Sequence, residues 1–481
     1  MGGMAGQCRI TNTQDPCHIS WNPDYNAIWS WCGGSGQGLD MVFGILPNGA
    51  SSLLIPTYKA RRQVNNYKQA YNFLSLSPIH FDNVNELKTK MEWLKPKASG
   101  SKAKKGKDMD TSSANKGYYV TIASDGRAVT DRGWQRAAFE HSRILYQILR
   151  HDLDPVYLGL DRRYRRDVLG DVQFVALALN YWAEDLDWLR DAESLQLLDV
   201  GYTTFRVARN IDQGENQLVF GETHHLTCKE KSALKKKGLE RLPAAPGSQT
   251  TSQTLPFADL SLNIQTLLTS LESSSEPVII LVYDEAPLRT DVANRSLVGA
   301  ALQKLKVNIS RWKKVPQDGG LFSYDSPRAR SRSPKREQPH NASSSRDPRA
   351  RPRRSRSPPT RHDLRRGDIH CVDVSQMINA LNPVNGKDLS LPQMARCLGL
   401  GDTTSGWCAG TEAQYLAKMW LELAKGTPVD DQADQRKAQF EALPPSKGHM
   451  QSVDKAPMEH ANNNPYNRDD DEDEDYEDEE Y

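Results

Sequence analysis

Apolar and polar positions alternate with two different periods between residues 134 and 424. Residues 172–179 and 278–283 are nearly continuous apolar runs with the length of buried strands. Residues 196–205 alternate apolar and polar side chains, and further strands are expected at 217–226 and 369–374. Apolar residues recur at helical spacing over 134–149, 261–271, 291–305, 391–398 and 412–424. This order predicts an α/β fold, a mixed sheet flanked by helices.

The first part of the chain has a weaker pattern. Residues 1–37 are rich in Gly, Asn, Trp and Cys without a period, which predicts an irregular leader. Apolar runs at 41–46 and 52–55 flank a Pro-Asn-Gly sequence and predict a hairpin. The bases and aromatic residues that follow could bind single-stranded nucleic acid or pack as an amphipathic element: Arg61, Arg62, Tyr67, Tyr71 and Phe73. We expect a partly irregular region with a small α/β element over 1–95.

Composition divides the rest of the chain. An apolar fraction of 37% and a mean hydropathy of −0.68 are low for a wholly folded protein. Residues 96–117 predict a basic flexible linker, and 118–170 a helical lead-in. Residues 326–366 hold 13 Arg and one Lys against three acids, which predicts a long disordered loop inserted into a domain at 171–425. Residues 426–481 predict a disordered tail with an acidic end, where 11 acids gather.

Cysteine usage and hydropathy restrict the cellular setting. The seven cysteines are scattered and never form a Cys-x-x-Cys pair, which is typical of a reduced intracellular chain. Cys8, Cys17, Cys32 and His18 could supply four zinc ligands, but their spacing fits no common zinc pattern, so we expect ordinary thiols. No apolar run follows a basic start, and none approaches the ~18–20 residues of a membrane span. The sequence predicts a protein that is neither secreted nor in a membrane.

Four short motifs follow one another within the predicted domain. The first strand reads Val-Ala-Leu-Ala-Leu-Asn-Tyr-Trp from Val175, and the second contains Asp-Val-Gly-Tyr from Asp199. Asp284 directly follows a later buried strand, and Trp407-Cys-Ala-Gly-Thr-Glu412 begins the last helix. In order and spacing these motifs resemble the ribonuclease-H-like 3′-to-5′ exonucleases with four acids and a histidine. Within them the closest likeness is to the exonuclease-like C-terminal domain of fungal proteins. The resemblance implies a ribonuclease-H-like mixed sheet.

The resemblance also implies that the catalytic positions have been replaced. The first motif of the family is Asp-x-Glu, and here Ala178 and Asn180 stand at those positions. Trp407 stands at the catalytic histidine and Glu412 at the following aspartate. The candidates for a retained acid are Asp284 and Asp291. Such enzymes hold two divalent cations with carboxylates, whereas alanine offers no ligand and tryptophan accepts no proton. The resemblance therefore predicts a pseudo-nuclease without catalytic residues, bound metal or cofactor.

Two other interpretations of these positions stay open. Ala178 and Asn180 could be core and edge positions of an unrelated α/β sheet. A displaced metal site, which would take Mg²⁺ or Mn²⁺, could be rebuilt from the acids and histidines near the first and third strands: Glu184, Asp185, Asp187, His224 and His225. The second interpretation would make the protein an active exonuclease.

Basic segments predict binding to nucleic acid. RNA is the favoured type, because the arginine-serine tracts resemble those of messenger-RNA-processing factors. The candidate phosphate-binding residues are Lys102, Lys104, Lys105, Lys107, Lys235, Lys236, Lys237, Arg353, Arg354 and Arg356. The candidates for phosphorylation, each followed by proline, are Ser326, Ser333 and Ser357. We therefore expect an inactive exonuclease-like protein that associates with RNA in the nucleus or nucleocytoplasm.

A hypothesis of a different class is a protein-interaction scaffold. Its arginine-serine loop would be regulated by phosphorylation. Its acidic tail would mimic nucleic acid or screen that loop at short range, because the Debye length is about 8 Å at physiological salt. Removal of the tail would then raise the affinity for nucleic acid.

Overall fold

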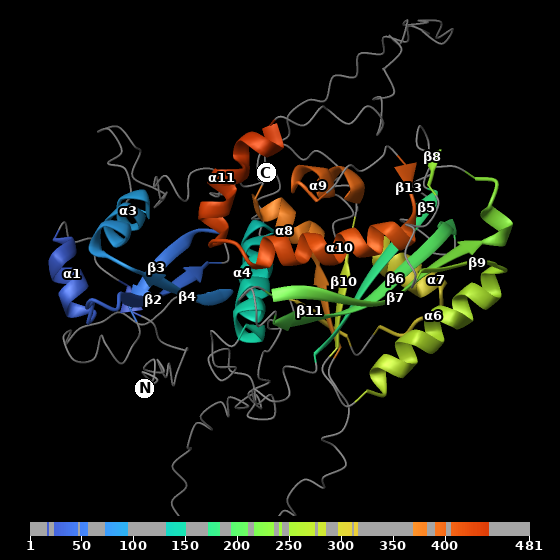
Figure 1. Cartoon of the computed structure of the whole chain (residues 1–481), viewed down its shortest axis with the longest axis horizontal. Helices are drawn as coiled ribbons and strands as arrows, with labels where there is room; N and C mark the ends of the chain where they lie inside the picture. The colour runs from blue at the N-terminus through green and yellow to red at the C-terminus, as the bar shows by residue number, and fades with distance from the viewer. Residues whose placement is uncertain are drawn as a thin grey trace, which may run out of the picture.

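A computed structural model describes residues 17–18, 24–46, 49–55, 73–94, 131–150, 172–182, 194–209, 216–234, 240–242, 250–274, 278–284, 297–309, 312–315, 369–381, 390–400 and 406–441. These residues form a seven-stranded, a four-stranded and a two-stranded sheet together with helices (Figure 1). The fold is mixed α/β, as the sequence predicts. Within the described part of the chain, no helix is both long and apolar enough to cross a membrane.

The main sheet joins an antiparallel half to a parallel half. Its strands are β5 Gln173–Trp182, β6 Gln196–Arg209, β7 Asn216–Cys228, β9 Thr250–Leu255, β10 Val278–Val282, β11 Lys313–Val315 and β12 Ile369–Asp373. They lie in the order β11-β12-β10-β5-β6-β7-β9. Strands β5, β6 and β7 are antiparallel neighbours, whereas β10 is parallel to both β5 and β12. Strand β11 is parallel to β12, and β9 to β7.

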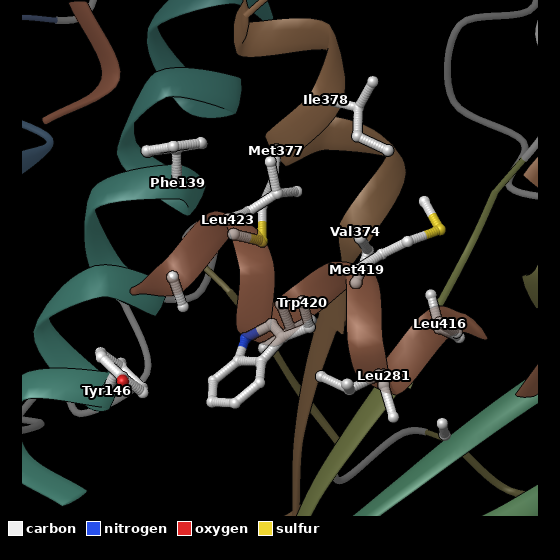
Figure 2. Close-up of a cluster of buried hydrophobic side chains, with 14 of the residues drawn as sticks. Phe139, Tyr146, Leu281, Val374, Met377, Ile378, Leu416, Met419, Trp420 and Leu423 are labelled. Carbon is white, nitrogen blue, oxygen red and sulfur yellow. The ribbon is translucent and has the colours of Figure 1, made fainter. Parts of the chain in front are cut away.

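Helices cover both faces of the main sheet because β5 is apolar on both sides. Val175 and Leu177 pack against α6 Phe257–Glu272 and α7 Leu297–Lys304. Phe174 and Ala176 face α4 Asp131–Leu149, α8 Val374–Leu381 and α10 Ala409–Ala424. Figure 2 shows this second core, in which Trp420 lies among side chains of α4, α8 and β10. The short helix α9 Leu391–Cys397 packs on the same side.

A smaller sheet lies at the N-terminal side. Its strands are β1 Cys17–His18, β2 Leu39–Ile45, β3 Ser51–Ile55 and β4 Ser75–Phe81, all antiparallel in the order β1-β3-β2-β4. Helices α1 Tyr25–Trp31 and α3 Val84–Leu94 share an apolar core with it. Phe43 and Ile45 of β2 join the core around α4, so the small sheet packs on the main domain.

Buried charges bind the small sheet to the C-terminal helix α11 Val429–Glu441. Arg136 of α4 forms an ion pair with Asp430, which also accepts a hydrogen bond from the Ser51 hydroxyl at 2.9 Å. Nζ of Lys90 lies 2.9 Å from a carboxylate oxygen of Asp431. Arg136 and Asp430 are almost fully buried, so each needs the other as a partner.

Most of the predicted strands and helices are confirmed, with shifted ends. The hairpin at 41–46 and 52–55 is the β2–β3 pair, and the helix at 134–149 is α4. The expected helix at 291–305 is described only as α7, because 291–296 lie outside the described residues. The inserted loop at 326–366 and the linker at 96–117 also lie outside them.

Two expectations of irregular structure are wrong in part. The leader at 1–37 contains α1, whose first turn is capped by the Asp24 side chain accepting from the Ala27 amide at 3.0 Å. The tail expected from residue 426 begins with α11, whose Val429 and Asp430 are buried. Helix α1 is only seven residues long and α11 has a polar sequence, so burial against neighbouring elements stabilises both more than their own apolar pattern.

Candidate functional site

The positions that carry the resemblance meet at one end of the main sheet. Asn180 lies near the end of β5, and its Nδ2 donates a hydrogen bond to Oε2 of Glu412 at 2.8 Å. Glu412 is in the first turn of α10, and both side chains are buried. Ala178, two residues earlier on β5, is buried in the core on the α10 side and presents only a methyl group. The neutral amide of Asn180 thus donates a hydrogen bond to one oxygen of the Glu412 carboxylate.

Glycines allow α10 to lie directly on the sheet. Gly201 of β6 is paired with Ala178, and a side chain at this position would overlap the carbonyl group of Ala409. A Cβ added to Gly410 would lie only 2.9 Å from the Cβ of His225 on β7. The Ala-Gly pair of the last motif is therefore a packing requirement, and it brings the first turn of α10 over β5.

A second group of polar side chains comes from β6, β7 and β9 and lies next to the start of α10. Nε2 of His225 lies 2.7 Å from Oδ2 of Asp199, and its Nδ1 lies 3.1 Å from the Ser252 hydroxyl. The Ala409 amide donates to the same Asp199 oxygen at 3.4 Å. Burial lowers the pKa of His225, but hydrogen bonds and charges of Asp199 and Cys408 outweigh burial and raise it to about 9. At neutral pH the imidazolium therefore compensates the buried Asp199 carboxylate.

The parallel half of the sheet ends in a pair of acids. The Asp284 amide donates to Oδ1 of Asp373 at 3.3 Å. Both carboxylates also receive backbone N–H groups at helix starts, Asp284 from Leu297 at 3.0 Å and Asp373 from Ser375 at 2.9 Å. Burial and the neighbouring Asp284 charge raise the pKa of Asp373 to about 7. The role of Asp373 was not predicted from the sequence, although an acid between a strand and a helix is a recognisable capping position.

Trp407 fills the position that the resemblance assigns to the histidine. It is buried in β13 Gly406–Trp407, which pairs in parallel with β8 Glu240–Arg241. The Arg241 guanidinium lies 4.7 Å from the centre of the indole ring. Indole accepts no proton near neutral pH, so Trp407 packs against a basic side chain and cannot act as a base.

The residues present do not fit a pair of divalent cations. Glu412 is bonded to Asn180, Asp199 is paired with His225, and the remaining two acids accept backbone N–H groups at helix starts. Oδ1 of Asp199 is buried without a hydrogen-bond partner in the described part of the chain, but hard cations need several oxygen ligands. Among the described residues, no group of three or more His, Cys, Asp or Glu is arranged to hold a metal ion.

Of the rebuilt site, His224 and His225 are described, and the structure separates their roles. His224 stacks on Tyr202 with ring centroids 4.5 Å apart, on the opposite side of β7 from the buried His225. The following candidate residues lie outside the described part of the chain: Glu184, Asp185, Asp187, Asp291, Lys102, Lys104, Lys105, Lys107, Lys235, Lys236, Lys237, Ser326, Ser333, Arg353, Arg354, Arg356 and Ser357.

Comparison with known proteins found no relative of this chain. No family model matches the chain, and searches of curated proteins and of solved structures gave no significant match. The geometry of the site therefore stands alone as the basis for a function.

Proposed function

We propose that this protein is a catalytically inactive, exonuclease-like protein that associates with nucleic acid, RNA above all. Sequence order and spatial arrangement support the proposal together. Strands β5 and β6, which hold the first two motifs, are antiparallel neighbours. Strand β10, which is followed by Asp284, is parallel to β5. The last motif begins helix α10, which lies over β5. Motif positions far apart in the sequence thus meet at the end of β5.

The proposal that the protein does not cleave nucleic acid rests on the hydrogen bond between Asn180 and Glu412. A metal-dependent nuclease needs a cluster of carboxylates whose repulsion is relieved by the cations. Here the amide of Asn180 relieves the negative charge of Glu412 at 2.8 Å without a cation. Ala178 supplies no oxygen at the neighbouring position of β5. A nucleic acid could lie across this end of the sheet without being cleaved.

A basic segment beside the site supports binding of phosphates. A short 3₁₀ helix, Lys229–Lys231, directly follows β7 and has a lysine on either side of Glu230; Lys229 is exposed. The same segment continues through three consecutive lysines to Arg241, whose strand pairs with Trp407 just before α10. Each lysine that neutralises a phosphate releases a counterion, so the affinity should fall steeply with salt. The preference for RNA rests on the arginine-serine segment at 326–366.

The test is an incubation of the full chain with labelled single- and double-stranded RNA and DNA, with Mg²⁺ or Mn²⁺. We expect retention that weakens with salt while every label keeps its full length. Metal-dependent shortening from the 3′ end that is lost in Glu412→Gln would refute the pseudo-nuclease. Absence of retention at low salt would refute association with nucleic acid and favour the protein scaffold.

A matched pair of variants tests the basic segment. Replacing Lys235, Lys236 and Lys237 with Gln should lower the slope of log affinity against log salt by up to about 2 for single strands. The control replaces three exposed lysines on other elements with Gln: Lys88, Lys425 and Lys437. An equal loss in both variants would mean that only net charge matters and that the segment is not the interface.

A further inference from the structure

The two outer strands of the main sheet differ in how they are protected. At one edge, β11 is only three residues long and begins with two lysines. Proteins commonly protect edge strands in this way, because short length and charge prevent pairing with another chain. At the other edge, β9 is six residues long and reads Thr-Thr-Ser-Gln-Thr-Leu, without a charge or a proline. Among the described residues, the β9 edge thus has none of the usual protection.

Strand β9 is also accessible and held in place. Its four central residues are exposed and its end residues half-buried, and no described strand lies beyond it (Figure 1, beside α6). All six residues pair with β7 without a bulge. Ser252 is further fixed by the 3.1 Å contact with His225, which is held in turn by Asp199. A partner strand would therefore meet a preformed edge and lose little free energy in ordering it.

We propose that β9 pairs antiparallel with β9 of a second copy of this chain, joining the two main sheets into one. In such a symmetric interface the strand faces a copy of itself, so a strand whose charges had one sign would be repelled by its copy. The neutral composition of β9 meets this condition, and its hydroxyl side chains can bond to one another. This interface is independent of the proposed nucleic-acid function.

Symmetry restricts the register of this pairing. A two-fold axis between antiparallel strands is perpendicular to the sheet and keeps each side chain on its own face. Directly opposed residues must then be separated by an even number along the strand, because side chains alternate faces. Centring on Ser252 places Thr250 opposite Thr254 of the second copy and Ser252 opposite itself. Hydroxyl pairs of this kind are favourable, so we assign this register.

The test measures the mass of the full chain in solution across a range of concentrations by light scattering or sedimentation. We expect a reversible dimer. Thr250→Lys with Thr254→Lys puts two like-charged pairs across the axis and should weaken the dimer at least about tenfold. Thr250→Lys with Thr254→Glu is the matched control, because each lysine then faces a glutamate and the dimer should persist.

Each outcome decides the proposal. A chain that stays monomeric at every concentration overturns it, as does a dimer that the two lysines leave unchanged. Loss of the dimer in the lysine–glutamate variant overturns the assigned register. Oxidative cross-linking gives a second readout, since Ser252→Cys should form a dimer through a disulfide, while Gln253→Cys, which is opposite position 251, should not.

Discussion

Replacing Asn180 with aspartate tests the central interaction of the candidate site. The variant exchanges a buried amide donor, 2.8 Å from the Glu412 carboxylate, for a second carboxylate. Because Asn180 is 1% exposed and Glu412 is 5% exposed, both acids cannot stay ionised together. Keeping one acid protonated at pH 7, three units above an ordinary acid pKa near 4, costs about 4 kcal/mol. We expect Asn180→Asp to lose about that much of the free energy of unfolding.

Urea denaturation of both proteins across a range of pH measures this cost. The unfolded aspartate titrates near pH 4, so the loss should shrink by about 1.4 kcal/mol for each pH unit from pH 7 to pH 5. The control combines Asn180→Asp with Glu412→Gln, which exchanges the donor and the acceptor and should restore most of the stability at every pH. A loss below about 1 kcal/mol at pH 7 would mean that solvent reaches the pair and that the site is open. Added Mg²⁺ stabilising Asn180→Asp but not the parent chain would show that the amide alone excludes the cation.

Three further predictions concern the surroundings of the site. Asp430→Ala removes the carboxylate that compensates the buried charge of Arg136 and should cost about 3–5 kcal/mol in urea denaturation. The pKa of His225 is raised to about 9 in the fold, so its contribution to stability is present below pH 6.5 and is lost as the pH rises from 6.5 to 9. His225→Gln should therefore flatten the fall in the free energy of unfolding over that range. Gly201→Ala forces a side chain into the backbone of α10 and should lower stability by about 3 kcal/mol, measured by thermal unfolding.

A different result would contradict each of these three predictions. Asp430→Asn keeps the shape of the side chain without its charge, and a cost near zero for this variant would mean that charge plays no part. A parent chain whose stability does not fall between pH 6.5 and 9 would mean that the His225 pKa is not raised. If Gly201→Ala is as stable as the parent chain, α10 does not contact β6 as closely as described.

The sequence predicted the sheet well because its strands are strongly apolar or regularly alternating. Segments such as 172–179 and 278–283 have the length and the continuous apolar composition typical of buried strands in a covered sheet. It predicted less where the fold depends on contacts between distant elements. Helix α11 has a polar sequence, and the ion pair of Asp430 with Arg136 joins residues far apart in the chain. Strand β9, with its hydroxyl side chains, has a composition that is equally typical of a loop.

At the candidate site the residues could be found in the sequence, but their pairing could not. Asn180 and Glu412 were singled out by the resemblance, through their order relative to the other motifs. Their hydrogen bond could not be predicted, since it depends on how closely α10 approaches β5. Ser252 was missed altogether, because a serine in a polar stretch carries no pattern that relates it to His225. Proximity in space, and not residue type, decides these roles.

Under the proposed function, the same pairing explains how a nuclease-like site can do without a metal and keep its fold. Buried carboxylates are unstable unless a positive or donating group compensates them. In this chain Glu412 receives the Asn180 amide, Asp199 receives the His225 imidazolium, and the acids after β10 and β12 receive N–H groups from helix starts. Protein groups thus do what cations do in a metal-dependent nuclease. On this reasoning, the second carboxylate in Asn180→Asp needs a cation to compensate its charge. Stabilisation of this variant by added metal should therefore be detectable before any nuclease activity.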